Sequence, residues 1–252
     1  MFMIDKNVWR SVTTAREINQ SMYTEKRTFE FQSDQNMHSK LLYKKFFDTL
    51  LSGAGLILSS WLWVIIGIAI IMEDGFPVLI RQSRVGRAGK LFFSFKFRSM
   101  RKCALKERIN SQAFENDHRI TSVGRFLRKT ALDELPQLLN IFLNDMSFVG
   151  PRALLPKEAE INGGFQYTKI DDVPGYEKRT AVYPGLTGIA QIYSPRDIPR
   201  KYKFKYDILY IKKMNLLIDI KLILLSCLIS ARGTWEKRHA KIGILKRGIY
   251  RT

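Results

Sequence analysis

The longest apolar stretch of the chain runs from residue 49 to residue 72 and contains no charged side chain. Its 24 residues exceed the roughly 20 that an α-helix needs to cross the hydrocarbon core of a bilayer. About 48 residues precede the stretch, so a cleaved secretory signal is not expected. The pattern therefore predicts a membrane helix, which we bound at residues 40–75.

Basic residues flank this stretch on both sides. Lys40, Lys44 and Lys45 precede it, and six lysines and arginines follow between residues 81 and 98. Because lysine and arginine favour the cytoplasmic side of a membrane, a spanning helix would place one basic flank on the wrong side. A re-entrant segment, which dips into one leaflet and returns, is the favoured interpretation. A single-pass anchor is the main alternative, and a buried core helix is the third.

The polar and apolar positions further along the chain predict short elements. Residues 78–85 and 91–97 are rich in β-forming residues around the turn GRAGK and predict a hairpin. Helical spacing of apolar residues predicts helices over 120–129 and 135–146, the second ended by VGPR, and a short helix is expected at 154–162 in an otherwise irregular region. Residues 202–230 predict one or two amphipathic helices, suited either to the bilayer interface or to the core.

These elements indicate a mainly α (α+β) membrane-associated fold, with a re-entrant or spanning N-terminal membrane helix, a small β-hairpin and amphipathic interfacial helices. We expect an N-terminal polar extension over 1–39, either a tail or a short peripheral helix. The membrane helix (40–75) and a cytoplasmic domain (76–230) follow, and a basic tail (231–252) ends the chain.

The net charge of the chain indicates which classes of molecule it could bind. Lys and Arg number 42 against 23 Asp and Glu, a net charge of +19. Such a charge favours a polyanion, a phosphate-bearing substrate or an anionic membrane surface. Two cysteines, Cys103 and Cys227, are too few for a disulfide framework, and the sequence carries no zinc spacing, GxGxxG or P-loop motif.

The densest cluster of candidate chemistry lies between residues 96 and 152. Pro136 is tolerated only in the first turn of a helix, so a helix is expected to begin near Asp133. The free N–H groups of that helix and the upstream Arg125 and Arg128 form a phosphate-binding arrangement. One of the adjacent carboxylates, Asp133 or Glu134, could attack phosphorus or hold Mg²⁺ while the other orients a partner. The structural alternative for Asp133 is a simple helix cap.

Seven motifs occur in order along the chain. They are KKFFD (44–48), RQSRVG (81–86), KFRSM (96–100), RIT-VG-FLRKTALDELPQLLN (119–140), DMSFVGPR (145–152), PGLTGIAQ (184–191), and YDILYIKK with LLIDIKLIL (206–213 and 216–224). In these motifs the chain resembles the bacterial sugar transferase family, the monotopic polyprenyl-phosphate phosphoglycosyl transferases. The resemblance covers about residues 43–228.

The resemblance implies transfer of a sugar-1-phosphate from a UDP-sugar to undecaprenyl phosphate, with release of UMP, as the first step in making a surface glycan. It implies two steps through a covalent phospho-sugar on Asp133, assisted by Glu134, with Mg²⁺ held at these two carboxylates. A bacterial inner-membrane location with the catalytic domain facing the cytoplasm follows from the lipid acceptor. Anionic inner-membrane lipid is an expected partner, a homo-oligomer is left open and no nucleic acid is expected.

The family's phosphate-binding cations match Lys96, Arg128 and Arg152, and Arg98, Arg119 and Arg125 are further candidates. Gln191 in the PGLTGIAQ loop and Arg196 just after it complete the expected substrate-binding set.

Two departures from the family pattern and two other functions are kept in view. Ser60-Trp61 stands where family members commonly carry Ser-Pro, so no proline fixes a bend in the membrane helix, and Ala153 replaces the last proline of GPRP. A membrane-tethered nucleic-acid binder and a non-catalytic scaffold are the alternative functions. The sequence does not identify the sugar.

Overall fold

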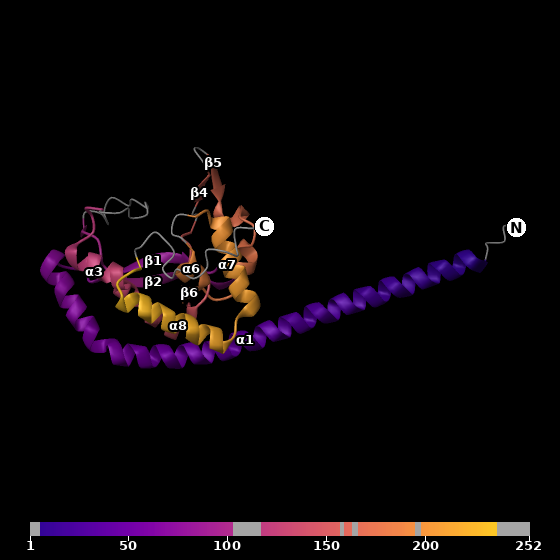
Figure 1. Cartoon of the computed structure of the whole chain (residues 1–252), viewed down its shortest axis with the longest axis horizontal. Coiled ribbons are helices and arrows are strands. Elements are labelled where there is room, and N and C mark those ends of the chain that lie inside the picture. Colours follow the sequence, from indigo (N-terminus) through magenta and orange to yellow (C-terminus); the bar gives the residue numbers. More distant parts are fainter. Residues whose placement is uncertain (1–5, 103–116, 157–158, 163–165, 195–197, 236–252) are drawn as a thin grey trace. The chain divides into compact units, whose positions relative to one another are not determined.

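The computed structural model describes residues 6–102, 117–156, 159–162, 166–194 and 198–235 (Figure 1). The chain divides into two compact units, Met1–Tyr43 and Lys44–Thr252. The elements in chain order are α1 (Lys6–Asp74), β1 (Leu79–Val85), η1 (Arg87–Gly89), β2 (Leu91–Phe97), α3 (Ser122–Thr130), η2 (Leu132–Glu134), α4 (Gln137–Phe142), β3 (Ser147–Val149), β4 (Ala159–Asn162), β5 (Gln166–Lys169), η3 (Ile170–Asp172), α5 (Tyr176–Thr180), β6 (Gly185–Thr187), α6 (Ile189–Tyr193), α7 (Arg200–Lys213) and α8 (Leu216–Ala231).

The predicted fold class is confirmed: the described residues are mainly helical and carry small two-stranded sheets. Strands β1 and β2 form the predicted antiparallel hairpin, with Leu79 opposite Phe97 and Val85 opposite Leu91. A second antiparallel pair joins β4 to β5, and β3 pairs with β6 in parallel. The helix predicted over 120–129 is α3. In the first unit, helix α1 begins at Lys6, so helix rather than tail occupies most of the expected polar extension.

Two other predicted elements were wrong. The helix expected over 135–146 is limited to Gln137–Phe142, because Asn144 takes a left-handed backbone (φ 64°) that ends it and leads the chain into β3. The short helix expected at 154–162 is replaced by β4, whose backbone groups find hydrogen-bonding partners in β5.

The two helices after residue 198 take different environments. Helix α7 buries Phe204, Tyr210 and Ile211 in the domain. Helix α8 is capped by Asn215, whose side-chain oxygen accepts a hydrogen bond from the Ile218 amide. It leaves a row of large apolar side chains exposed, namely Leu217, Leu224 and Leu228. Of the two environments predicted for residues 202–230, α7 therefore occupies the core of the domain. Helix α8 presents an apolar surface that is suited to lipid.

The segment Ser39–Asp74 of α1 is long and apolar enough, by length and composition, to cross a membrane. One side of it packs within the second unit, where Ile66 and Ile70 join Phe97 and Leu127 in a buried cluster. Trp63 contacts the Phe97 ring edge-on, with 5.4 Å between ring centroids. The opposite side exposes Ile57, Leu58, Trp61, Val64, Ile68 and Met72. Figure 1 shows this purple part of α1 curving without a break in the ribbon.

The start of this segment is attached to the domain by buried charges. Lys44 Nζ lies 2.7 Å from Asp219 Oδ2 of α8, and both side chains are almost fully buried. Tyr210 donates its hydroxyl hydrogen bond to the other oxygen of Asp219 (2.6 Å). The Asp48 carboxylate accepts hydrogen bonds from the Ser147 hydroxyl and from a backbone amide of β3. Lysine and aspartate of the KKFFD motif thus hold α1 to α8 and β3.

The end of the segment is attached to the same unit. The Glu73 carboxylate accepts hydrogen bonds from the Ser122 and Val123 amides at the start of α3, at 2.6 and 2.9 Å. Asp74 lies 3.2 Å from the Arg98 guanidinium. Both ends of the apolar segment therefore contact one domain.

We predict that Lys44→Met destabilises the protein, because it leaves the Asp219 carboxylate buried without its cation. Breaking a buried ion pair costs about 3–5 kcal/mol, so the thermal unfolding temperature in lipid nanodiscs should fall clearly below that of the wild type. The double variant Lys44→Met/Asp219→Leu removes both charges and should recover much of the loss. An unchanged unfolding temperature for the single variant would contradict this assignment.

Candidate active site

The two adjacent carboxylates lie in a tight turn between α3 and α4. Helix α3 ends where Ala131 adopts a left-handed backbone (φ 57°), and the 3₁₀ turn η2 carries Asp133 and Glu134. Pro136 then precedes the first residue of α4. Helix α4 begins three residues after Glu134, so the dyad precedes the helix N-terminus at which it was predicted to lie. Its position is set by the turn, whose Leu132 packs with Leu135 against the Phe97 cluster.

Asn140 of α4 holds this turn beside strand β2. Its fully buried side chain donates a hydrogen bond to the Phe93 carbonyl (2.7 Å) and accepts one from the Phe95 amide (3.0 Å). The side-chain amide of Asn140 therefore satisfies backbone hydrogen-bonding groups at the free edge of β2, as a neighbouring strand would. The docking brings Lys96 opposite Glu134, with 2.5 Å between Nζ and Oε1.

Arg152 approaches the same carboxylate from the other side, after β3. Its Nη2 lies 3.3 Å from Glu134 Oε1, and half of its side chain is exposed. Gly150 and Gly185 allow the approach of the two loops, because a Cβ at either position would clash with the backbone of the other loop. An isolated parallel bridge, separate from the β3–β6 pairing, also joins Arg152 to Gly185.

A buried arginine that the sequence analysis missed positions Arg152. Arg179 of α5 donates a hydrogen bond to the Arg152 carbonyl (2.6 Å) and another to Asp207 Oδ2 (3.1 Å). Its guanidinium stacks over the Phe204 ring, 4.5 Å from the centroid. Both charged side chains of the Arg179–Asp207 pair are 4% exposed. The pair fixes the backbone from which Arg152 extends.

The two carboxyls of the dyad titrate in opposite directions. Burial raises the pKa of Asp133 to about 6; Lys96 opposes this shift and the neighbouring Glu134 carboxylate adds to it. Burial also acts to raise the pKa of Glu134, but Lys96 and Arg152 outweigh it and lower that pKa to about 2. Glu134 is therefore the ionised partner of the cations. Asp133 has no hydrogen bond or ion pair with any side chain that the structure describes.

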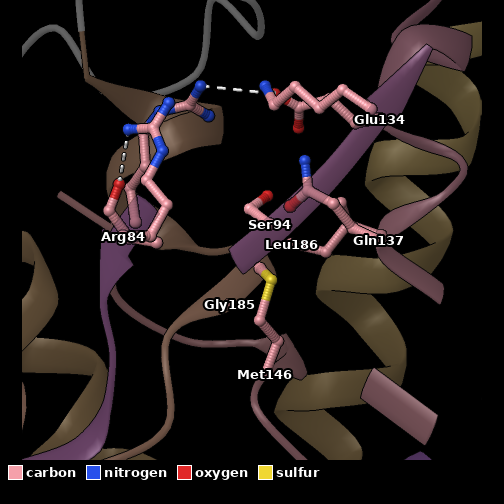
Figure 2. Close-up of a pocket in the computed structure, with 10 residues that line it drawn as sticks. Arg84, Ser94, Glu134, Gln137, Met146, Gly185 and Leu186 are labelled. Carbon is pink, nitrogen blue, oxygen red and sulfur yellow. Dashed lines mark hydrogen bonds and ion pairs between the residues drawn. The ribbon is translucent and has the colours of Figure 1, made fainter. Parts of the chain in front are cut away.

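A pocket opens beside the dyad (Figure 2). Its lining residues are Arg84, Ser94, Lys96, Glu134, Gln137, Met146, Arg152, Ala153, Gly185 and Leu186. Figure 2 shows Arg84 across the pocket from Gln137, with a hydrogen bond from its guanidinium to the Ala153 carbonyl (3.2 Å). Three cations and one ionised carboxylate thus surround a concave site, an arrangement suited to phosphate groups.

Comparison with known proteins identifies the family. The model of the family described as "Bacterial sugar transferase" matches residues 39–233. The chain belongs to the bacterial sugar transferase family.

Three curated relatives illustrate the similarity. The UDP-glucose:undecaprenyl-phosphate glucose-1-phosphate transferase of Klebsiella pneumoniae is 38% identical over 191 residues, which are 74% of this chain and 39% of that protein. The exopolysaccharide production protein PSS of Rhizobium leguminosarum bv. phaseoli is 36% identical over 73% of this chain and 92% of its own length. The undecaprenyl-phosphate galactose phosphotransferase of Salmonella typhimurium is 36% identical over 76% and 41%. The chain thus spans about two fifths of two relatives and nearly all of the third.

The cations expected to bind phosphate are not all in one place. Lys96 and Arg152 line the pocket, and the charge of Arg128 acts on the pKa of Asp133. Arg98, 1% exposed, pairs instead with Asp74 at the end of α1. Arg119 is also buried, and its guanidinium binds both oxygens of Asp117. Arg125 is exposed on α3.

Of the two substrate-binding residues expected in and after the PGLTGIAQ loop, the structure describes one. Gln191 donates a hydrogen bond to the Gly150 carbonyl (3.3 Å) and so joins the loop to the segment before Arg152. Arg196 lies outside the described residues.

The dyad fits Mg²⁺ as part of a coordination sphere and not as a complete protein site. Among the described residues there is no group of three or more His, Cys, Asp and Glu that could hold a metal. Mg²⁺ is usually bound through one or two carboxylates together with substrate phosphates. Asp133 and Glu134 supply that number of carboxylates beside the cations that line the pocket.

We predict that Glu134→Gln lowers the pKa of Asp133, because the negative charge of Glu134 contributes to its rise. The pKa can be followed by isotope-edited infrared titration of the aspartate carboxyls, with Asp133→Asn identifying the signal. The deprotonation midpoint should move to lower pH in the variant. A midpoint that stays near the wild-type value or moves upward would contradict the electrostatic coupling of the dyad.

Proposed function

We propose that the protein is a phosphoglycosyl transferase that moves a sugar-1-phosphate from a UDP-sugar to undecaprenyl phosphate and releases UMP, the initiating step of a surface polysaccharide. The names of the Klebsiella and Salmonella relatives support the donor and acceptor, and that of the Rhizobium relative supports a role in exopolysaccharide production. The observation that carries the proposal is that Asp133 has no hydrogen bond or ion pair with a described side chain and lies near the positive charges of Lys96, Arg128 and Arg152.

The reaction would proceed in two displacements at one phosphorus atom. The Asp133 carboxylate attacks the phosphorus that bears the sugar, and the bond to the bridging oxygen breaks, so that UMP leaves with the electron pair. A phosphate oxygen of undecaprenyl phosphate then attacks the same phosphorus and releases the Asp133 carboxylate. Two steps allow a soluble donor and a lipid acceptor to use one site in turn.

The cations remove the main obstacle to this attack. A carboxylate and a diphosphate repel each other, and Lys96, Arg128 and Arg152 neutralise part of that charge. Glu134 holds Lys96 and Arg152 in place through its two ion pairs. Mg²⁺, held by Asp133 and Glu134 together with the donor phosphates, would supply further charge neutralisation.

We also propose a re-entrant membrane segment in the bacterial inner membrane, with the catalytic domain in the cytoplasm. Lys44 at the start of the apolar segment and Glu73 at its end contact the same domain, which supports both ends lying on one side of the bilayer. The exposed apolar faces of α1 and α8 would enter lipid, and the basic surface would attract anionic head groups.

The covalent step is tested by trapping. With a UDP-sugar labelled in the β-phosphate, acid quenching before acceptor is added should give a labelled protein whose adduct maps to Asp133. Asp133→Asn should lose the adduct and at least about 10³-fold of lipid product, since it removes the nucleophile. Asp172→Asn, at an exposed aspartate outside the pocket, is the matched control and should behave as the wild type. Lipid product forming at the wild-type rate in Asp133→Asn would refute the assignment.

The topology is tested by labelling single cysteines in a background with Cys103 and Cys227 replaced by serine. Lys45→Cys and Arg81→Cys place exposed thiols at the two ends of the apolar segment. A membrane-impermeant maleimide added to intact spheroplasts should label neither position, and permeabilisation should expose both. Labelling of position 45 from outside would establish a spanning helix instead.

A further inference from the structure

Two buried polar side chains in the pocket have no hydrogen-bonding partner. Ser94 is 2% exposed and Gln137 is 4% exposed, and both line the pocket. No hydrogen bond joins either side chain to another residue in the described part of the chain. The polar atoms of both side chains keep contact with solvent through the pocket, so they are available to a ligand. These two are therefore placed to bind something that enters the pocket.

Ser94 and Gln137 lie close in sequence to Lys96 and Glu134, and all four residues line the pocket. Ser94 precedes Lys96 by two residues on β2, so their side chains share one face of the hairpin. Gln137 follows Glu134 by three residues, and it is the first residue of α4. Figure 2 shows the Gln137 side chain extending toward Ser94, with Glu134 on one side and Met146 on the other.

The charged and neutral parts of the pocket are separated. Lys96, Arg152 and Glu134 form a connected ion-pair group at the dyad. The Arg84 guanidinium is held by the Ala153 carbonyl and the Gln82 side chain. Away from these charges the lining consists of Ser94 and Gln137 together with the apolar Met146 and Leu186. If the cations take the phosphates, a neutral hydrogen-bonding group is left for Ser94 and Gln137.

A carbohydrate ring matches this neutral part in its chemistry. Its hydroxyls both donate and accept hydrogen bonds, which a carboxamide and a hydroxyl can satisfy together. Its C–H faces are apolar and suit contact with Met146 and Leu186. A UDP-sugar carries two such rings, the ribose and the transferred sugar.

We propose that Ser94 and Gln137 form a subsite that binds ring hydroxyls of the nucleotide-sugar donor. The proposal rests on the proposed function, since it takes a UDP-sugar as the ligand. The transferred sugar is the favoured source of the hydroxyls, because it is attached to the phosphorus that Asp133 would attack and the subsite begins beside the dyad.

The subsite is tested by equilibrium binding with no turnover. In the Asp133→Asn background, reconstituted in nanodiscs with Mg²⁺, calorimetry gives the Kd of UMP and of a UDP-sugar. The UDP-sugar is whichever of UDP-glucose, UDP-galactose and UDP-N-acetylgalactosamine the wild type converts to lipid product. Gln137→Leu removes the amide with little change of volume, and Ser94→Ala removes the hydroxyl. Ser83→Ala on the neighbouring strand, outside the pocket lining, is the matched control.

Loss of one or two hydrogen bonds should weaken UDP-sugar binding about threefold to tenfold in each variant, and Ser83→Ala should leave it unchanged. An unchanged Kd for UMP assigns the subsite to the transferred sugar. An equal weakening of UMP supports the hydroxyl subsite but assigns it to the ribose. Unchanged UDP-sugar binding in Ser94→Ala and in a folded Gln137→Leu overturns the proposal. If Gln137→Leu does not fold, Ser94→Ala alone decides.

The failure of this proposal is distinguishable from failure of the proposed function. Lipid product from the wild type and its loss in Asp133→Asn report the transfer reaction. The two binding constants report the subsite independently, since they are measured without chemistry.

Discussion

The ion pair between Lys96 and Glu134 is the interaction on which the site depends. It joins the strand β2 to the turn η2 at 2.5 Å, and Arg152 meets the same carboxylate oxygen. Two cations around one carboxylate keep Glu134 ionised, as its lowered pKa shows. The adjacent Asp133 has no hydrogen bond or ion pair with another side chain in the described part of the chain, and its pKa is raised. One acid of the dyad thus orders the cations, and the other stays available for chemistry.

This geometry requires five segments of the chain: β2, α4, the loop after β3, α5 and α7. Asn140 fastens α4 to the edge of β2, which sets the distance between Glu134 and Lys96. On the other side, Arg179 holds the backbone of Arg152 through a buried pair with Asp207. Neither Asn140 nor Arg179 faces the pocket lining, and each acts by fixing the backbone of a residue that does.

The sequence predicted the elements whose signals are local. The hairpin β1–β2 follows from β-forming residues around a Gly-rich turn, and α3 from apolar spacing. The parallel pair β3–β6 has only three residues in each strand and joins segments about 38 residues apart, so no local period marks it. The shortened α4 depended on the backbone of Asn144, which residue type alone did not indicate.

The site was predicted in part. The motifs placed Lys96, Arg152 and the dyad in one cluster, as the geometry has them. Arg98 is two residues from Lys96 and was expected to act with it, but its guanidinium turns to Asp74 at the end of α1. Ser94 could have been found from the alternation in LFFSFKF, which puts it on the face of Lys96. Arg179 carries no such signal, because its role depends on a contact with Asp207 that only the fold creates.

The apolar segment of α1 and the site are connected through a short series of hydrogen bonds. Asp48 of α1 binds the Ser147 hydroxyl and the amide of the next residue on β3. Strand β3 ends at Val149, whose carbonyl accepts a hydrogen bond from Tyr210, and Arg152 follows three residues later. Tyr210 in turn contacts Asp219, the partner of Lys44. The position of the apolar helix is therefore fixed to the same strand that delivers Arg152 to the dyad. The proposed transfer to a lipid phosphate would depend on this fixed arrangement, because a displacement of the reacting groups by about 1 Å is enough to reduce the rate severely.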